Sequence, residues 1–540
     1  MRTILKNGRC HTLNENNDIV EAILAENGKI AAVGTNEEIM KLAKDGDAII
    51  DAGGKTVMPG FYDSHMHLLS YGYSLTMAYL DDCNSIEDVI TTLKKYIEDN
   101  NIPPGTWVEG RGWNETNYPE GRMPNRFDLD RVSTEHMISI GRSCSFICIT
   151  NTKALSELGF MEKLPDVSSG MVEADENGVP TGIFRGEAKE AVYSRLPKLG
   201  VERIKQSIVA ACEKYKEAGI TSAETDDFEL TRAGDFNDIL KAYKELDEAG
   251  ELPIRVNLML YLPEDEQQQE FYKYGFKTGD GSDFFRIGKF KLLTDGSLGV
   301  REAALLEPYA DDPTNYGGPL VTQEAICRKV KDAYEHGLIT VCDGMGDFGI
   351  YLALKAYEPI VAAHPDEDLR FGIDHCQITT EGLIEEYARL GVVAGCELVF
   401  VKSDIEIAED RVGKHRASLS YNWKRFFDNG CVVAAGSDSP VEDYNPMLGI
   451  EGAVNRRDWD NQPPEGWFSE QCITVEQAVQ AFTTGAAYAN YEENEKGTIE
   501  VGKFADLIVL SDDIFSMNKD DLAKAKVEKT IIGGELVYSA

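Results

Sequence analysis

The sequence lacks several features that would place a chain of 540 residues in other classes of protein. No apolar run is long enough to span a membrane, and residues 1–8 lack the apolar core of a secretion signal. We therefore expect a cytoplasmic protein with no membrane partner. Basic residues are also few, since 54 Lys and Arg stand against 93 Asp and Glu, and the formal net charge is -39. Such a chain repels nucleic acid and anionic lipid, so no nucleic-acid partner is expected.

Paired cysteines are absent and histidines are scarce. The 11 cysteines are scattered without a Cys-x-x-Cys pair, so we expect reduced thiols in the core and assign them no chemical role. Only 8 histidines occur, yet His65 and His67 are two residues apart after the apolar run 57–62. Side chains alternate on a strand, so both imidazoles would point the same way. Two imidazoles at fixed geometry form half of a metal site, although such a pair is often only structural.

The residues around this pair complete a longer motif. Pro-Gly-Phe-x-Asp-x-His-x-His at 59–67, preceded by the run 49–55, resembles the first barrel strand of the amidohydrolase superfamily. The resemblance implies an α/β fold: a (β/α)8 barrel with metal at its C-terminal face and a small β-sandwich built from both chain ends. It also implies hydrolysis of a carbon–nitrogen bond of a small molecule by metal-bound hydroxide. The expected cofactor is a divalent metal, zinc in the first place, as one or two ions.

The rest of the chain is consistent with this organisation. Short strand and turn patterns occupy residues 1–57 and 495–540, and we assign both to the β-sandwich. Between them, residues 58–494 alternate helical patterns with apolar runs, which is typical of parallel βα units and predicts the barrel. A barrel needs about 250 residues, so the length allows insertions. Residues from about 71 to 190 exceed what one barrel unit needs, and they are predicted to form an insertion after the first barrel strand.

Motifs within the predicted insertion resemble one branch of the superfamily, amidohydrolase family 3, whose members include N-substituted formamide deformylases. The motifs lie at 107–114, 119–122, 128–130, 151–155 and 180–182. Trp113 is a candidate for the wall of the substrate pocket. Arg142 matches the family and is a second candidate for substrate binding, whereas Phe146 stands where the family usually has a histidine.

Three further segments carry candidate metal ligands. Lys291 falls where the family has a metal-bridging lysine, and the resemblance implies that carbon dioxide carbamylates it. Lys289 shares its strand face and is the alternative, because a lysine inside a barrel is costly unless paired or modified. His375 resembles another metal-binding histidine. Asp438 follows the apolar run 432–435 and would bind metal and act as the catalytic base.

Three positions depart from the family within the barrel. Asp343 stands where a histidine ligand is usual, so it either coordinates through oxygen, which favours a harder ion, or one of the two metals is absent. Glu397 and Phe400 replace a usual glutamine and a usual histidine at positions expected to face the pocket, and Glu397 is a candidate for substrate binding. These changes indicate that the substrate, or even the reaction, differs from that of the formamide deformylases.

Three hypotheses follow from the sequence. The first is a metal-dependent hydrolase in which Asp438 passes a proton to the leaving amine. The second keeps the barrel and one metal but catalyses an isomerase or lyase reaction, with Asp343 or Asp438 moving the proton. The third is a metal-free binding protein, which the joint presence of the candidate ligands disfavours. A homodimer is what the resemblance implies.

Overall fold

A computed structural model describes residues 2–143, 147–166 and 170–540, and Phe146 lies outside this part of the chain. The described residues form two compact units. The first comprises Met1–Leu68, Cys212–Glu229 and Tyr243–Ala540, and the second comprises Leu69–Ala211 and Leu230–Ala242. No helix in the described part of the chain combines the length and the apolar character needed to cross a membrane.

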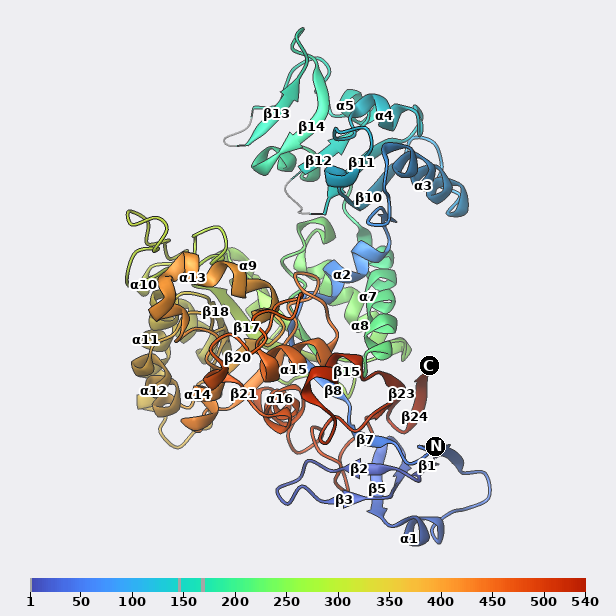
Figure 1. Cartoon of the computed structure of the whole chain (residues 1–540), viewed down its shortest axis with the longest axis vertical. Helices are drawn as coiled ribbons and strands as arrows, with labels where there is room; N and C mark the ends of the chain where they lie inside the picture. Colours follow the sequence, from blue (N-terminus) through green and yellow to red (C-terminus); the bar gives the residue numbers. More distant parts are fainter. Residues whose placement is uncertain (1, 144–146, 167–169) are drawn as a thin grey trace. The chain divides into compact units, whose positions relative to one another are not determined.

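The first unit is built on a sheet of eight parallel strands, in the order β21-β20-β19-β18-β17-β16-β15-β8 (Figure 1). Their bounds are β8 (Phe61–Met66), β15 (Ile220–Thr225), β16 (Arg255–Tyr261), β17 (Phe285–Leu293), β18 (Thr340–Gly344), β19 (Gly372–His375), β20 (Val393–Glu397) and β21 (Val433–Gly436). Backbone hydrogen bonds bring the first and last strands together: Asp438 N donates to His65 O and His67 N donates to Ser439 O, each over 2.8 Å. This nearly closed barrel confirms the predicted α/β fold class.

Helices follow most of the barrel strands. They are α9 (Asp265–Tyr272), α10 (Gln323–Glu335), α11 (Asp347–Ala363), α12 (Glu381–Leu390), α13 (Val401–Ala417), α14 (Trp423–Asp428), α15 (Pro446–Asn455) and α16 (Val475–Gln480). The sequence of α12 shows why they form. The hydroxyl of Thr380 accepts a hydrogen bond from Leu383 N at the start, and Gly391, with φ 66°, ends the helix in the left-handed conformation. Leu383, Ile384, Tyr387 and Leu390 form its buried face, at the spacing of a helix.

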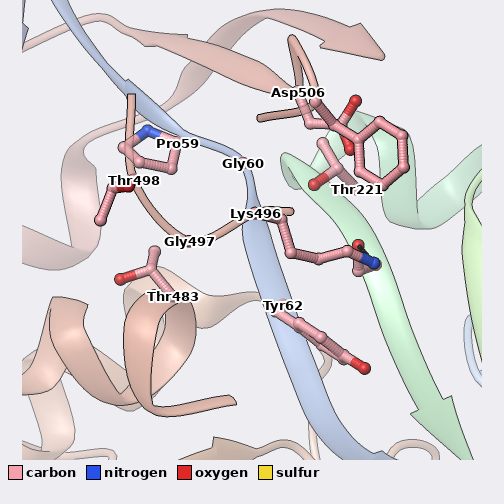
Figure 2. Close-up of a pocket in the computed structure, with 11 residues that line it drawn as sticks. Pro59, Gly60, Tyr62, Thr221, Thr483, Lys496, Gly497, Thr498 and Asp506 are labelled. Atoms are coloured by element: carbon pink, nitrogen blue, oxygen red, sulfur yellow. Dashed lines mark hydrogen bonds between the residues drawn. The ribbon is translucent and has the colours of Figure 1, made fainter. Parts of the chain in front are cut away.

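Polar side chains pair with one another inside the barrel. Lys289 Nζ on β17 lies 2.9 Å from Glu224 Oε2 on β15, and both side chains are buried. The hydroxyl of Tyr62 on β8 donates to Glu492 Oε2 over 2.9 Å. Tyr62 and Lys496 also line a small space of about 10 Å³, enough for about one water molecule. Figure 2 shows both side chains among the residues that line it. These contacts occupy polar groups that would otherwise be buried without partners.

Both chain ends contribute strands to two smaller sheets. One has the order β5-β4-β1-β6, with β1 (Arg2–Lys6), β4 (Ala22–Glu26), β5 (Lys29–Gly34) and β6 (Ala48–Asp51). The other has the order β24-β23-β22-β7-β2-β3, with β2 (Arg9–His11), β3 (Ile19–Val20), β7 (Thr56–Pro59), β22 (Leu507–Leu510), β23 (Val527–Ile532) and β24 (Glu535–Ser539). β7 and β22 pair antiparallel and so join the two ends of the chain. Leu5, Ile23, Val57 and Leu507 belong to one apolar cluster that includes both sheets.

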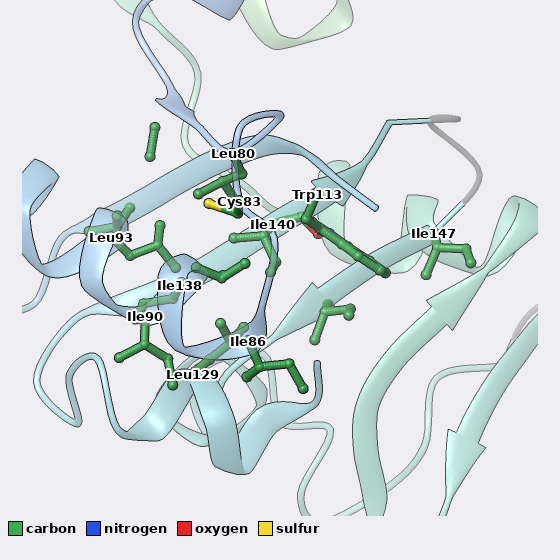
Figure 3. Close-up of a cluster of buried hydrophobic side chains, with 14 of the residues drawn as sticks. Leu80, Cys83, Ile86, Ile90, Leu93, Trp113, Leu129, Ile138, Ile140 and Ile147 are labelled. Carbon is green, nitrogen blue, oxygen red and sulfur yellow. The ribbon is translucent and has the colours of Figure 1, made fainter. Parts of the chain in front are cut away.

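The second unit contains a sheet of order β13-β14-β12-β11-β10-β9. Its strands are β9 (Ala78–Tyr79), β10 (Trp107–Trp113), β11 (Met137–Arg142), β12 (Ile147–Thr150), β13 (Met171–Ala174) and β14 (Pro180–Arg185). Its helices include α2 (Leu68–Leu75), α3 (Ile86–Asp99), α4 (Arg126–Asp130) and α5 (Thr152–Glu157). Figure 3 shows the apolar core, in which Ile86, Ile90 and Leu93 of α3 pack with Ile138 and Ile140 of β11. The unit is wider than the predicted insertion of about 71–190, whose bounds stay a prediction.

Candidate metal centre

Three side chains from the first and last barrel strands form the nucleus of the site. His65 lies on β8, His67 follows its end, and Asp438 follows β21. Asp438 Oδ1 lies 2.9 Å from His67 Nε2 and 3.5 Å from His65 Nε2. The strands approach so closely that a Cβ on Gly436 would lie 2.7 Å from His65 Cβ and 2.8 Å from its backbone nitrogen. Glycine at 436 therefore allows β21 to place Asp438 against the histidine pair.

The backbone is strained at two of the predicted ligands. His375 has φ 73° and Asp438 has φ 56°, both in the left-handed region that residues with a side chain rarely adopt. Such conformations cost of order 1–3 kcal/mol each and persist where the surrounding structure holds them. Here the strain lies at the C-terminal ends of β19 and β21, where the side chains turn towards the barrel axis. Both residues are therefore held in an unfavourable backbone conformation where the candidate ligands meet.

All three histidines are oriented by an oxygen at Nδ1. His65 Nδ1 lies 3.0 Å from Asp374 Oδ2, His375 Nδ1 lies 3.1 Å from Glu397 Oε2, and His67 Nδ1 lies 2.9 Å from the carbonyl oxygen of Asp226. A proton on the Nδ1 that faces each of these oxygens would leave the Nε2 lone pair free for a metal. Carboxylate and carbonyl partners of this kind orient histidine ligands and make them more basic. The three Nε2 atoms are therefore the candidate ligand atoms.

Lys291 lies beside two carboxylates at the same level of the barrel. Its Nζ is 3.0 Å from Asp226 Oδ2 and 3.0 Å from Asp343 Oδ2, and its side chain is 1% exposed. Burial by itself would lower the pKa of Lys291, but the charges of Asp226 and Asp343 raise it well above its ordinary value. Asp343 Oδ2 also lies 3.5 Å from His375 Nε2, so this carboxylate reaches both the lysine and a candidate ligand.

The donors present fit a divalent metal. His65, His67 and Asp438 each offer one ligand atom, and these atoms lie within 4.8 Å of one another. His67, Asp226 and Glu229 form a second such group. Among the described residues, the buried oxygens Asp438 Oδ1, Asp343 Oδ1 and both Oδ atoms of Asp226 have no hydrogen-bond donor in good geometry. Buried carboxylates need a partner, and a cation held jointly with imidazoles supplies it.

Electrostatics at the site favour a cation. Burial would raise the pKa of the Asp438 carboxyl, but its close contacts with the imidazoles of His65 and His67 outweigh burial and hold this pKa well below its usual range. Burial and the neighbouring charge of Asp226 raise the pKa of Glu229 to about 7. A positive ion beside Glu229 and Asp226 would relieve the repulsion that the raised pKa of Glu229 reflects.

The structure thus brings together His65, His67, Lys291, Asp343, His375 and Asp438, the six residues predicted from the sequence as metal ligands. Their metal coordination stays a prediction. Glu397 lies against His375 Nδ1, which favours a role in positioning that ring, whereas its contact with substrate stays a prediction.

The two other predicted substrate-binding residues belong to the second unit. Trp113 is fully buried in its apolar core, and its indole N–H donates to Ile140 O over 3.4 Å (Figure 3). This position favours a structural role for Trp113. Arg142 Nε donates to Glu115 Oε2 over 2.8 Å at the end of β11. Substrate contacts of both residues stay predictions.

Sequence reasoning missed Asp226, Glu229 and Asp374. Asp226 directly follows β15 and is fully buried, while Asp374 is the penultimate residue of β19. A signal was available for Asp226 and Glu229, because acidic residues that follow a barrel strand lie at the face where barrel enzymes carry their sites. No family motif points to these two residues.

Comparisons with known proteins agree with this geometry. The sequence model of the amidohydrolase family matches residues 48–538. The chain is 29% identical over 540 residues to YtcJ of Bacillus subtilis (strain 168), which is provisionally named an amidohydrolase, covering 100% of this chain and 99% of the relative. It is 25% identical to the N-substituted formamide deformylase of Arthrobacter pascens, covering 98% and 97%. An uncharacterized metal-dependent hydrolase from Pyrococcus horikoshii OT3 superposes with a TM-score of 0.78 at 27% identity, covering 96% of this chain and 99% of that structure.

Proposed function

This chain belongs to the amidohydrolase family and is a hydrolase, and on that premise we propose that it cleaves an amide-type carbon–nitrogen bond in a small molecule. The observation that carries the proposal is the convergence of His65 Nε2 and His67 Nε2 on Asp438 Oδ1. This arrangement provides ligands and a base at one point. The isomerase or lyase alternative and the metal-free alternative gain no support from the comparisons.

A divalent ion bound here would polarise the scissile carbonyl and make water acidic enough to attack near neutral pH. We propose zinc, because two or three imidazole nitrogens and a carboxylate suit it. Whether the chain holds one ion or two depends on Lys291 and Asp343. The protein's contribution is to fix the ligand rings through Asp374, Glu397 and the Asp226 carbonyl.

In the proposed reaction, Asp438 accepts a proton from the attacking water and returns it to the leaving nitrogen. The hydroxyl of that water joins the carbonyl carbon, the carbon–nitrogen bond breaks, and the products are a carboxylic acid and an amine. The imidazoles of His65 and His67 hold the pKa of Asp438 well below its usual range, so this carboxylate is ionised and can accept a proton from the attacking water.

We propose carbamylation of Lys291 only together with a second metal ion. A carbamate would replace a positive charge by a negative one between Asp226 and Asp343, both 3.0 Å from Nζ. Three anions at this spacing need two cations among them. We therefore propose that carbamylation and a second ion occur together, and that an ammonium at Lys291 accompanies a site with one ion.

Metal analysis combined with a product assay tests the proposed function. N-substituted formamides are the first compounds to assay, because a relative of similar length carries that activity in its name. We expect bound zinc, release of an amine, and loss of release after chelation with recovery on adding zinc. A protein with bound metal that hydrolyses no amide, formamide or cyclic amide would contradict the carbon–nitrogen specificity. The small-molecule substrate, the cytoplasmic location, the homodimer and the two-sheet sandwich of the chain ends remain proposals beside it.

A further inference from the structure

A basic segment interrupts this acidic chain within the second unit. Residues 189–205 contain five cations and two carboxylates, in a chain whose formal net charge is -39. Three of the cations, Arg195, Lys198 and Arg203, line one cavity of roughly 730 Å³. Cavities of about 300–1,000 Å³ are the usual size of small-molecule sites. All residues that line this cavity belong to the second unit.

The fourth cation of the cavity, Arg232, is already neutralised and makes the wall rigid. Arg232 Nη2 lies 2.8 Å from Glu109 Oε1, and its Nη1 donates to the carbonyl oxygen of Pro197. The other oxygen of Glu109 accepts the hydroxyl of Tyr73 over 2.5 Å. Glu109 therefore contributes little free negative charge to the cavity. Glu157, the second carboxylate of the wall, lies 3.6 Å from Lys153 Nζ.

Arg195 and Arg203 keep their charge available. Among the described residues, neither of these two side chains forms an ion pair with a carboxylate. Each is instead held by neutral contacts: Arg195 Nη1 donates to Ala191 O over 2.7 Å, and the Arg203 guanidinium lies 5.4 Å from the centre of the Tyr73 ring. Two positioned guanidinium groups without a carboxylate partner are suited to a planar or tetrahedral oxyanion.

The rest of the cavity wall is partly apolar. α7 (Gly200–Glu217) begins between Lys198 and Arg203, both of which line the cavity. The remaining wall includes Trp107 and Met137, which offer apolar surface to an organic group.

We propose that this cavity is a binding site for a small molecule that carries a phosphate group. The phosphate lies against Arg195, Lys198 and Arg203 at the start of α7, and the organic part packs against Trp107. This site goes beyond the hydrolase function, because none of its residues belongs to the metal centre. It gives the second unit a role of its own.

Calorimetric titration of the full-length metal-loaded protein with inorganic pyrophosphate tests the proposal. We expect saturable binding that weakens at least about tenfold, or 1.4 kcal/mol, in Arg195→Gln and in Arg203→Gln. Lys94→Gln is the matched control, because Lys94 is an exposed residue of α3 in the same unit and does not line the cavity. We expect this control to bind within about twofold of the unchanged protein.

Two further arms keep the result interpretable. Arg203→Lys retains the charge and should bind more tightly than Arg203→Gln, and Lys198→Gln removes the charge of an exposed side chain of the same wall. Binding that survives all three Gln variants but disappears after chelation would assign pyrophosphate to the metal centre and overturn the proposal. Absence of saturable binding, or equal binding of citrate, would overturn the assignment to phosphate.

Discussion

Two layers of the barrel interior each pair a lysine of β17 with an acidic residue of β15 or its C-terminal end, but the two pairs have different surroundings. In the lower layer, Lys289 of β17 meets Glu224 of β15 over 2.9 Å, and Asn490 Nδ2 donates to the same Glu224 oxygen over 2.9 Å. Two residues further along each strand, Lys291 meets Asp226 over 3.0 Å. Asn490 therefore adds a hydrogen bond to the Lys289–Glu224 pair, whereas the Lys291–Asp226 pair adjoins Asp343 and the histidines. A salt bridge at one level thus becomes part of a candidate metal centre at the next.

The two layers show how a structural pair of buried charges differs from the buried charges of a candidate metal site. A lysine and a glutamate that satisfy one another inside a barrel fix the register of their strands. The carboxylates of the upper layer instead outnumber the cations that the chain supplies, since Asp226 and Asp343 share the single ammonium group of Lys291. The excess of carboxylates over cations, rather than burial itself, distinguishes the site.

The largest effect is expected from removing the proposed base. Asp438→Asn keeps the side-chain volume but loses charge and basicity, so kcat/KM should fall by roughly 10²–10⁴-fold with the fold intact. Steady-state assays and circular dichroism measure the two quantities. A variant that retains more than about a tenth of the activity, a loss below about 1.4 kcal/mol in barrier, would exclude Asp438 as the base.

The lower layer should respond in stability instead. Lys289→Ala leaves Glu224 buried without its ion-pair partner, which typically costs roughly 3–5 kcal/mol of the free energy of unfolding. Urea denaturation of the metal-loaded protein measures this cost. The double variant Lys289→Met with Glu224→Gln is the control and should recover most of it, because no unpaired charge remains. Equal metal content in all three proteins is expected, and loss of metal in Lys289→Ala would show that the two layers are not separate.

The upper layer should respond in metal content. Lys291→Ala is expected to lose at least one ion, and short carboxylic acids such as acetate should partly restore it, because a carboxylate can occupy the place of a carbamate. Elemental analysis with and without acetate measures both. If Lys291 is instead an ammonium that neutralises Asp226 and Asp343, metal content will not fall and acetate will have no effect.

Family motifs in the sequence were sufficient to predict the barrel and the six residues that gather in the upper layer. His65, His67 and Asp438 follow apolar runs, so their strand ends and alternation could be predicted from local sequence. The partners of these residues could not, because Asp374 and Asp226 approach them across strands 159 or more residues apart in the chain. Trp113 shows the opposite limit: a tryptophan suits both a pocket wall and a core, and only tertiary packing decides between them.

The smallest and sharpest test concerns Asp343, which contacts both a candidate ligand and the lysine. If Asp343 binds metal, Asp343→His replaces oxygen by nitrogen beside His375 and should tighten zinc binding several-fold. If Asp343 only balances Lys291, the same change removes one of the two carboxylates beside a buried ammonium and should lower stability without tightening zinc. Asp343→Asn separates the two roles, since it keeps the shape but removes the charge. Zinc titration with a competing chelator and urea denaturation of both variants measure the outcomes. Unchanged zinc affinity and stability in both variants would exclude either role, and the centre would then be held by His65, His67 and Asp438 without Asp343.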